Sequence, residues 1–442
     1  MSVTFKKGIH PFHKKTKTEN LEIESVNLPK TVYISLSQHI GKPAKLIVEA
    51  GQKVKCGELI GLAEAGISAN IYSSVSGTVT GIVKRSNAQG SKVDHVQIEN
   101  DFLEEKVFLP ILENPSKEEI IARVKEAGIV GMGGAAFPTH IKLSPPPNTV
   151  LDTLIINTAE CEPYITCDYR ILLELTDDFI EGVKLLKKAT GTQFVIIGIE
   201  DNKINAVNHL KNRDDVYLAN NFKKIKKDKI NIIVLKSKYP QGAEKQLIYA
   251  ISKRIIPEGA LPSAVGICVN NVHTALSVYY AVKKGKPLYE RVLTVSGDAC
   301  KKPCNMWVKS GTSYRDLSEK CVQNNKYEML VSGGPMMGLT VYTEDISVTN
   351  ATSSILFLTD KEIDFINPSP CIGCGKCVMV CPMNLMPVFI DSNVLTGDYK
   401  EAKRYGAMSC IECGCCSYIC PAKKPLVQSI KLAKKMIRER KI

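Results

Sequence analysis

Eight cysteines near the C-terminus form two arrays with identical spacing. They are Cys371, Cys374, Cys377 and Cys381 in the first array, and Cys410, Cys413, Cys416 and Cys420 in the second. Thiolates at two-residue intervals can surround one metal centre only where the backbone between them turns tightly. Gly373, Gly375 and Gly414 suit such turns because they lack a Cβ atom. Cysteines that merely pack in a core would not repeat at a fixed interval, so the arrays predict bound metal.

The pattern C-x2-C-x2-C-x3-C-P resembles the ligand run of bacterial ferredoxins that carry two [4Fe–4S] clusters. In those ferredoxins the fourth cysteine of each run binds the cluster of the other run. The resemblance implies one cluster on Cys371, Cys374, Cys377 and Cys420, and another on Cys410, Cys413, Cys416 and Cys381. A zinc site usually shows separated cysteine pairs, and a disulfide framework belongs to small secreted domains. Cys415 lies outside the pattern, and we expect it to pack rather than to bind iron.

The composition is that of a multidomain globular protein. The chain has 442 residues, which is too many for one core, and it is 44% hydrophobic and 23% charged. No apolar run approaches the ~18 residues that span a bilayer, and no signal-like segment begins the chain. We therefore expect a cytoplasmic protein with reduced or metal-bound cysteines, attached to a membrane only through partners.

The chain is basic, with a formal net charge of +13 that two oxidised clusters would lower to about +9. Aromatic residues make up only 6% of the chain, and it contains no nucleic-acid-binding motif. We expect acidic partners or an anionic membrane surface, and no nucleic acid.

Residues 31–100 predict a small all-β module, because they are rich in valine, isoleucine, threonine and glycine and have regularly spaced turns. Residues 48–61 and 73–83 resemble the two halves of a biotinyl/lipoyl-type barrel-sandwich. Such domains attach their cofactor to a lysine on the hairpin between the halves. Leu59–Val75 contains no lysine, so we expect no swinging arm.

Strands and helices alternate after Ser116, which forms a capping box with Glu119. The expected buried strands are Leu151–Asn157, Phe194–Glu200 and Ile230–Leu235, and the expected helices are Asp177–Thr190, Lys203–Asn212 and Glu244–Arg254. This alternation predicts a doubly wound, Rossmann-like domain with a mostly parallel sheet. Short strands are expected again at 292–297, Lys309–Leu317 and 331–338, in a module the size of a β-grasp domain.

The C-terminal tail predicts an amphipathic helix with Leu426, Ile430, Ala433 and Ile437 on one face. The helix could dock on an acidic surface or lie over the cysteine arrays, and we favour the second arrangement.

A glycine-rich loop at residues 128–142 could hold a phosphate, since glycines allow close approach and successive amides can bind an anion. It lacks the spacing of a dinucleotide fingerprint and follows a helix rather than a strand. Three further segments fall where expected strands end, which is where α/β sheets bind ligands. They are INTAECEPY (156–164), YPQGAEKQ (239–246) and CVNNVHTAL (268–276).

These four segments together resemble the flavin- and NADH-binding subunit of respiratory complex I. The resemblance implies FMN contacts from Gly131, Gly133, Gly134, Lys142, Asn157, Glu160, Gly242, Asn270, Asn271 and Thr274. It implies nicotinamide-nucleotide contacts from Phe137, Glu162 and Glu244. This chain departs from that family at Met132, Ala136, Ala159 and Ala243, where polar residues or glycine are usual, and these departures remove polar partners for a nucleotide.

The order of modules, together with FKKGIHPFHKKT (5–16), resembles the RnfC family of the Rnf electron-transport complexes. The resemblance implies four domains: a barrel-sandwich (1–115), an FMN and NAD(H) domain (116–288), a β-grasp module (289–350) and a two-cluster ferredoxin-like domain (351–442). It implies a peripheral subunit on the cytoplasmic face of a membrane complex that oxidises ferredoxin, reduces NAD+ and translocates ions. Two alternatives are a soluble cobalamin reductase of similar architecture, and a wiring or docking subunit without an active flavin site.

Overall fold

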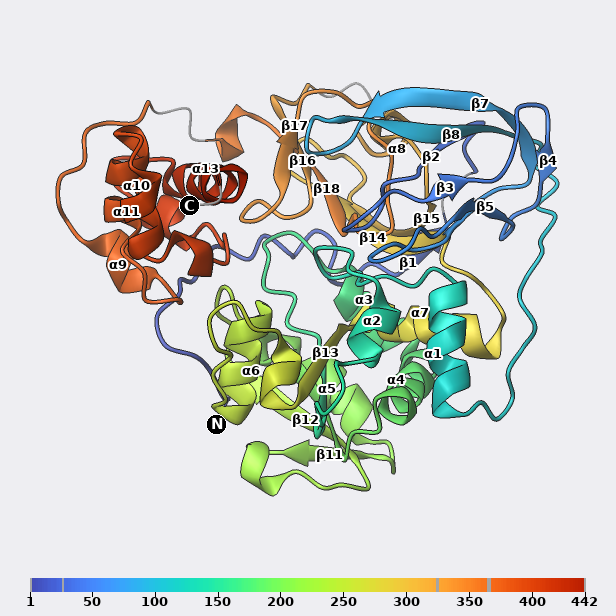
Figure 1. Ribbon diagram of the computed structural model, residues 1–442, viewed down its shortest axis with the longest axis horizontal. Coiled ribbons are helices and arrows are strands. Elements are labelled where there is room, and N and C mark those ends of the chain that lie inside the picture. The colour runs from blue at the N-terminus through green and yellow to red at the C-terminus, as the bar shows by residue number, and fades with distance from the viewer. Residues whose placement is uncertain (1, 26–27, 323–325, 364–366, 441–442) are drawn as a thin grey trace.

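The computed structural model describes residues 2–25, 28–322, 326–363 and 367–440, and its elements group into four modules (Figure 1). Within these four ranges, no helix is both long and apolar enough to cross a bilayer. Short 3-10 turns join several elements: η1 (Asp201–Lys203), η2 (Phe222–Lys224), η3 (Pro262–Val265), η4 (Asp360–Glu362) and η5 (Ala407–Ser409).

Two small antiparallel sheets form the predicted barrel-sandwich. One contains β2 (Thr31–Ser35), β8 (Lys92–Asn100), β7 (Gly77–Ser86) and β4 (Lys53–Val54), and the other β3 (Lys45–Leu46), β5 (Leu59–Leu62) and β6 (Ile71–Tyr72). Alternate residues of β2 and β8, such as Val32, Ile34 and Ile98, are fully buried between the sheets. This is the pattern of strands with one covered face.

The predicted parallel sheet is present, and we call this unit the parallel-sheet domain. Its strand order is β11 (Val216–Ala219), β12 (Ile230–Leu235), β10 (Phe194–Glu200), β9 (Thr153–Asn157) and β13 (Ile267–Asn271). Every neighbouring pair is parallel. Runs of β-branched residues such as those of β10 suit a sheet that is buried on both faces.

Helices cover both faces of this sheet. One core contains side chains of α1 (Lys117–Glu126), α2 (Thr139–Leu143), α3 (Cys167–Glu174), α4 (Thr176–Thr190), α5 (Ile204–Lys211) and α7 (Val272–Lys283). The opposite core contains α6 (Glu244–Ser252). The capping box of Ser116 and Glu119 begins α1, as the sequence predicts.

A six-stranded sheet forms the third module, which we call the mixed-sheet domain. Its order is β1 (Ile23–Ser25), β15 (Cys304–Lys309), β14 (Glu290–Ser296), β18 (Ser354–Leu358), β16 (Met329–Ser332) and β17 (Leu339–Val341). The expectation of a strand at Lys309–Leu317 is wrong beyond Lys309, because Ser313 and Asp316 form a capping box that begins α8 (Tyr314–Cys321). β18 lies in the middle of this sheet although it follows residue 350, where the sequence places a domain boundary.

The last module, the cysteine domain, has only helices as regular elements throughout the described residues 367–440. Its helices are α9 (Lys376–Val380), α10 (Pro387–Leu395), α11 (Tyr399–Arg404), α12 (Cys415–Ile419) and α13 (Leu426–Glu439). The four predicted apolar residues of α13 are all buried, and Ile430, Ala433 and Ile437 pack against α10 and α11. The tail therefore lies over the cysteine domain, as we favoured.

The N-terminal segment, residues 2–25, lies outside the barrel-sandwich sheets. It passes between the cysteine domain and the parallel-sheet domain and ends in the mixed-sheet domain (Figure 1). Val3 pairs with Leu235 at the end of β12, Ile9 pairs with Tyr239, and β1 pairs with β15. The Gly8 amide also donates to the carbonyl of Val380 in α9, so one segment contacts three modules.

Gly182 provides a stability test, because α4 and α7 approach closely at this residue. A Cβ atom there would lie 2.0 Å from the carbonyl oxygen of Ala275. Gly182→Ala should lower the free energy of unfolding by about 1–3 kcal/mol, because the two helices must separate. Trp307, the only tryptophan, packs against α7 and reports unfolding by fluorescence. The exposed control Lys188→Ala should unfold like the unmodified protein, and an equal midpoint for Gly182→Ala would contradict this packing.

Candidate functional site

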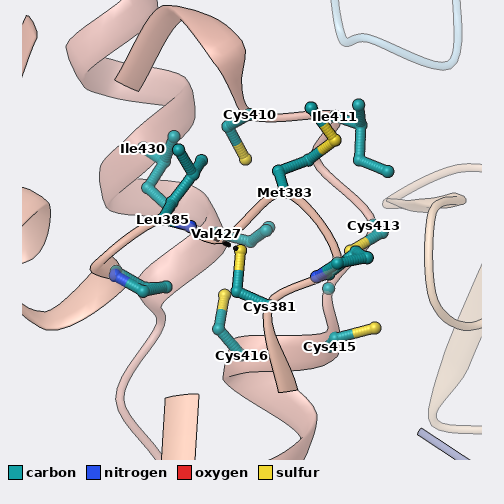
Figure 2. Close-up of a pocket in the computed structure, with 13 residues that line it drawn as sticks. Cys381, Met383, Leu385, Cys410, Ile411, Cys413, Cys415, Cys416, Val427 and Ile430 are labelled. Carbon is teal, nitrogen blue, oxygen red and sulfur yellow. Dashed lines mark hydrogen bonds between the residues drawn. The ribbon is translucent and has the colours of Figure 1, made fainter. Parts of the chain in front are cut away.

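Four cysteines from both arrays surround one cavity in the cysteine domain (Figure 2). They are Cys381 of the first array and Cys410, Cys413 and Cys416 of the second, which we call the buried cysteine set. The cavity is also lined by Cys415 and by apolar residues such as Leu385, Val427 and Ile430. This is the grouping that crossed ligation predicts.

The remaining cysteines form the exposed cysteine set, Cys371, Cys374, Cys377 and Cys420. Cys371 and Cys374 are exposed, whereas Cys377 and Cys420 are partly buried and pack against a cluster of Cys416, Leu426 and Val427. Cys420, the fourth cysteine of the second array, therefore lies near Cys377, the third cysteine of the first.

The backbone turns as the spacing predicts. Gly373, Gly375 and Gly414 all have positive φ angles, of 69°, 68° and 79°. Gly375 and Gly414 occupy equivalent positions, immediately before α9 and α12. The two arrays are therefore structurally similar as well as similar in sequence.

The buried cysteine set fits an iron–sulfur cluster. Backbone amides of Leu385 and Glu412 donate to the sulfurs of Cys381 and Cys410 at 3.3 Å, an interaction that tunes cluster potentials. Burial raises the pKa of the Cys410 thiol to about 11 and that of Cys416 to about 12. These thiols need a compensating cation to lose their protons, which an iron–sulfur core supplies.

Cys415, which lies outside the array spacing, is the fifth cysteine that lines this cavity. It is fully buried, and its thiol interacts with that of Cys413. It packs in an apolar cluster with Ile9 and Tyr239.

The predicted flavin residues lie at the carboxyl edge of the parallel sheet. β9 lies between β10 and β13, so the chain reverses its winding direction there, and such switch points bind ligands in α/β folds. Asn157 and Asn271 are direct register partners at the ends of β9 and β13. Asn157 also donates to the carbonyl of Gly242 at 2.8 Å, which brings in the loop after β12.

The glycine-rich loop lies against the start of α7. The amide of Met132 donates to the hydroxyl of Thr274 at 3.0 Å. A Cβ atom on Gly133 would lie 3.0 Å from the side chain of Asn271, whereas one on Gly134 would meet nothing within 4 Å. Gly131 closes the loop by donating to the carbonyl of Phe137 at 2.9 Å. The loop therefore leaves exposed backbone next to a helix N-terminus, an arrangement that suits a phosphate.

Lys142 of α2 and Glu244 of α6 meet at the same edge. The Lys142 ammonium lies 3.2 Å from the Glu244 carboxylate and 3.3 Å from the carbonyl of Val269. Both side chains are about one-third exposed, so a ligand could reach them. Asn270 is buried behind them and donates to the sulfur of Cys268.

Glu160 is engaged in the protein interior. One of its oxygens accepts the amide of Asp168 at 2.8 Å, and the other lies 3.3 Å from the ammonium of Lys203. Lys203 is also 3.7 Å from Glu200. Burial, followed by repulsion from Glu160, raises the pKa of Asp168. The FMN contact predicted for Glu160 thus falls on a residue that already holds a buried ionic network together.

Glu162 is bound by the loop between β16 and β17. Its oxygens accept the amides of Met336 and Met337 at 3.0 Å each, and the hydroxyl of Tyr239 lies 3.4 Å away. Burial raises the pKa of this carboxyl to about 7, although the two amides favour the ionised form. The nicotinamide contact expected for Glu162 remains a prediction. It would require the nucleotide to replace the hydrogen bonds from Met336, Met337 and Tyr239.

Lys15 and Tyr239, for which the sequence predicts no role, hold the loops after β9 and β12. The ammonium of Lys15 is buried and donates to the carbonyls of Glu160, Glu162 and Ile165 in the loop after β9. Tyr239 follows β12 and contacts the cysteine domain. No spacing in the sequence indicates either role, because both depend on contacts between distant segments.

Family models match most of the chain. Residues 3–103 match the RnfC barrel sandwich hybrid domain, residues 124–280 the Nuo51 FMN-binding domain, and residues 363–421 a 4Fe-4S dicluster domain. A relative from Clostridium ljungdahlii is 41% identical over 98% of this chain and 94% of its own length. That relative is the C subunit of a proton-translocating ferredoxin:NAD(+) oxidoreductase complex.

The chain belongs to the RnfC family. The Acetobacterium woodii relative, from a Na(+)-translocating ferredoxin:NAD(+) oxidoreductase complex, is also 41% identical, over 98% of this chain and 97% of its own. The corresponding protein of an ion-translocating oxidoreductase complex in Rhodobacter capsulatus is 40% identical, over 99% of this chain and 84% of its own. This membership confirms the resemblance on which the cofactor expectations rest.

The structure also resembles a crystal structure of an NAD+-reducing [NiFe]-hydrogenase in its H2-reduced state. The TM-score is 0.51 at 16% identity, and the match covers 74% of this chain and 62% of that one. At this identity the likeness concerns the fold alone.

The crossed cysteine sets can be tested with double substitutions. The protein should contain about eight iron atoms when purified anaerobically. Cys371→Ala combined with Cys420→Ala should leave about four, because both changes fall on one predicted cluster. The matched control, Cys371→Ala with Cys381→Ala, should leave almost none. The reverse result would mean that each array binds its own cluster.

Proposed function

We propose that this chain is the peripheral electron-transfer subunit of an Rnf-type membrane complex, located on its cytoplasmic face. The complex oxidises ferredoxin, reduces NAD+ and couples the reaction to ion translocation, with the other Rnf subunits as partners. The relatives with the same domains are subunits of ferredoxin:NAD(+) or ion-translocating oxidoreductases. When bound, FMN exchanges hydride with NAD(H), and two [4Fe–4S] clusters carry single electrons.

The observation that carries this proposal is the contact between the buried cysteine set and the loops of the flavin site. The hydroxyl of Tyr239, in the loop after β12, donates to the carbonyl of Cys413 at 2.7 Å. Gln246 of α6 lies 3.4 Å from the carbonyl of Pro382, directly after Cys381. The exposed cysteine set lies nearer the surface, where a redox partner could reach it.

Within the flavin site, the residues have separate roles. The glycine-rich loop and Thr274 would bind the phosphate, and Asn157, Asn270, Asn271 and Gly242 would hold the ring system at the edge of the sheet. Lys142 would stabilise negative charge on the reduced flavin, since a fixed cation in a partly buried site needs little reorganisation. Glu244 would exchange its ion pair with Lys142 for a nucleotide hydroxyl, and Phe137 and Glu162 are the other proposed nucleotide contacts.

The finer fold assignments also belong to this proposal. A doubly wound domain is supported by the parallel sheet with helices on both faces. A β-grasp module is supported by the hairpin β14–β15, the helix α8 and the central placement of β18 beside β14. We place the end of that module after Leu358 instead of at residue 350, because β18 belongs to its sheet.

Two alternatives remain distinguishable from this proposal. A cobalamin reductase would carry the same modules, but the relatives named above favour the ferredoxin:NAD(+) reaction. A wiring subunit without an active flavin site would explain the alanines at positions 136, 159 and 243.

Anaerobic titration with NADH should separate these functions. We expect NADH to bleach a flavin absorbance band and then to produce paramagnetic signals of reduced clusters. The wiring alternative predicts that dithionite, but not NADH, reduces the clusters. Co-purification with integral membrane subunits is expected for the Rnf assignment, and a chain found only in soluble fractions would favour the cobalamin reductase.

Lys142→Ala should weaken FMN retention, because it removes a cation from the flavin site, while iron content stays unchanged. Flavin and iron can be measured in the same anaerobic preparation. The control is Lys92→Ala on the exposed end of β8, which should retain both cofactors. Equal flavin occupancy in the two variants would exclude the role assigned to Lys142.

A further inference from the structure

A single buried tyrosine joins the flavin site to the buried cysteine set. Tyr239 is 1% exposed and follows β12, three residues before Gly242. Its hydroxyl donates to the carbonyl of Cys413 at 2.7 Å and lies 3.4 Å from the carboxylate of Glu162. One side chain therefore touches the loop after β9 and the backbone of a predicted cluster ligand.

The ring of Tyr239 packs in an apolar cluster where several modules meet. It packs with Ile9 of the N-terminal segment and Cys415 of the cysteine domain, and Met336 of the mixed-sheet domain and Cys161 border the same cluster. Because these neighbours are apolar, the hydroxyl would be costly to bury without partners. It has them in the Cys413 carbonyl and the Glu162 carboxyl.

The backbone of Tyr239 is fixed from the other side. Its amide and carbonyl pair with Ile9, with both hydrogen bonds at 2.9 Å. Gly8 permits this pairing, since a Cβ atom there would lie 2.5 Å from the Tyr239 carbonyl oxygen. The Gly8 amide also donates at 3.0 Å to the carbonyl of Val380, the residue before Cys381. The N-terminal segment thus joins Tyr239 to the first array, while the Tyr239 hydroxyl contacts the second.

We propose that Tyr239 is a positioning residue for electron transfer, which holds the Cys413 loop against the flavin site and tunes the cluster of the buried cysteine set. This inference rests on the proposed function, because it assumes a cluster on those four cysteines. The hydroxyl polarises the peptide after Cys413, directly beside a ligand sulfur. Hydrogen-bond donors around ligands stabilise the reduced, more negative cluster and raise its potential.

Tyr239→Phe provides the direct test, because it removes the hydroxyl and keeps the ring. We expect iron and flavin contents to stay normal and one cluster to shift to a more negative potential in a dithionite titration followed by paramagnetic resonance. With NADH, flavin bleaching should keep its rate while cluster reduction slows severalfold. Tyr249→Phe, on the outer side of α6, is the matched control and should change neither value.

Hydrogen exchange gives a readout that does not depend on turnover. Amides of residues 411–416 should exchange faster in Tyr239→Phe, because the Cys413 loop has lost its anchor. Gly8→Val is a second variant that displaces the Tyr239 backbone, and it should slow cluster reduction in the same selective way.

Unchanged cluster potentials together with unchanged exchange at 411–416 would overturn the inference. Loss of iron from Tyr239→Phe but not from Tyr249→Phe would also overturn it, since Tyr239 would then be required for folding of the site rather than for tuning. If the unmodified protein does not react with NADH, the proposed function fails. The dithionite titration would still decide the role of Tyr239.

Discussion

Hydrogen bonds between the N-terminal segment and three other modules set the spatial relation on which the redox chemistry depends. The segment forms an isolated bridge from Val3 to the end of β12, pairs with Tyr239, contacts α9 through Gly8 and ends as β1 in the mixed-sheet domain. Two cofactor sites on separately folded modules exchange electrons only if their separation is fixed. Backbone hydrogen bonds fix it better than surface ion pairs, which contribute little and are screened by salt.

The carboxyl edge of the parallel sheet is preorganised by buried charges. Lys15 binds three carbonyls of the loop after β9, and Lys203 lies between Glu160 and Glu200. Burial lowers the pKa of the Lys15 ammonium, and attraction to the nearby Glu160 carboxylate opposes that shift. Such a network is costly to break, because each charge would be left without a partner in the interior. The loop is therefore held rigid before any ligand binds.

The sequence predicts the features that depend on neighbouring residues, such as the bounds of single strands. Strands β10 and β12 have the predicted bounds, because their apolar runs end at clear turn residues. The structure brings Cys381 of the first array to Cys410, Cys413 and Cys416 of the second, and the crossed ligand sets stay a prediction. The strand expected at Lys309–Leu317 is wrong beyond Lys309, because the capping box of Ser313 and Asp316 begins a helix there. The path of residues 2–25, the partners of Glu160 and Glu162, and the role of Tyr239 could not be predicted, because each depends on contacts between modules.

The two cysteine sets differ in burial, and this difference should determine which one dioxygen damages first. Cys371 and Cys374 are exposed, and the neighbouring side chain of Ile372 is 70% exposed, whereas Cys381, Cys413 and Cys416 are buried. Dioxygen and chelators would therefore reach a cluster on the exposed cysteine set first, because apolar side chains shield the buried cysteine set. Oxidative damage should therefore begin at the exposed cysteine set. A partly inactivated sample would keep a cluster on the buried cysteine set longest.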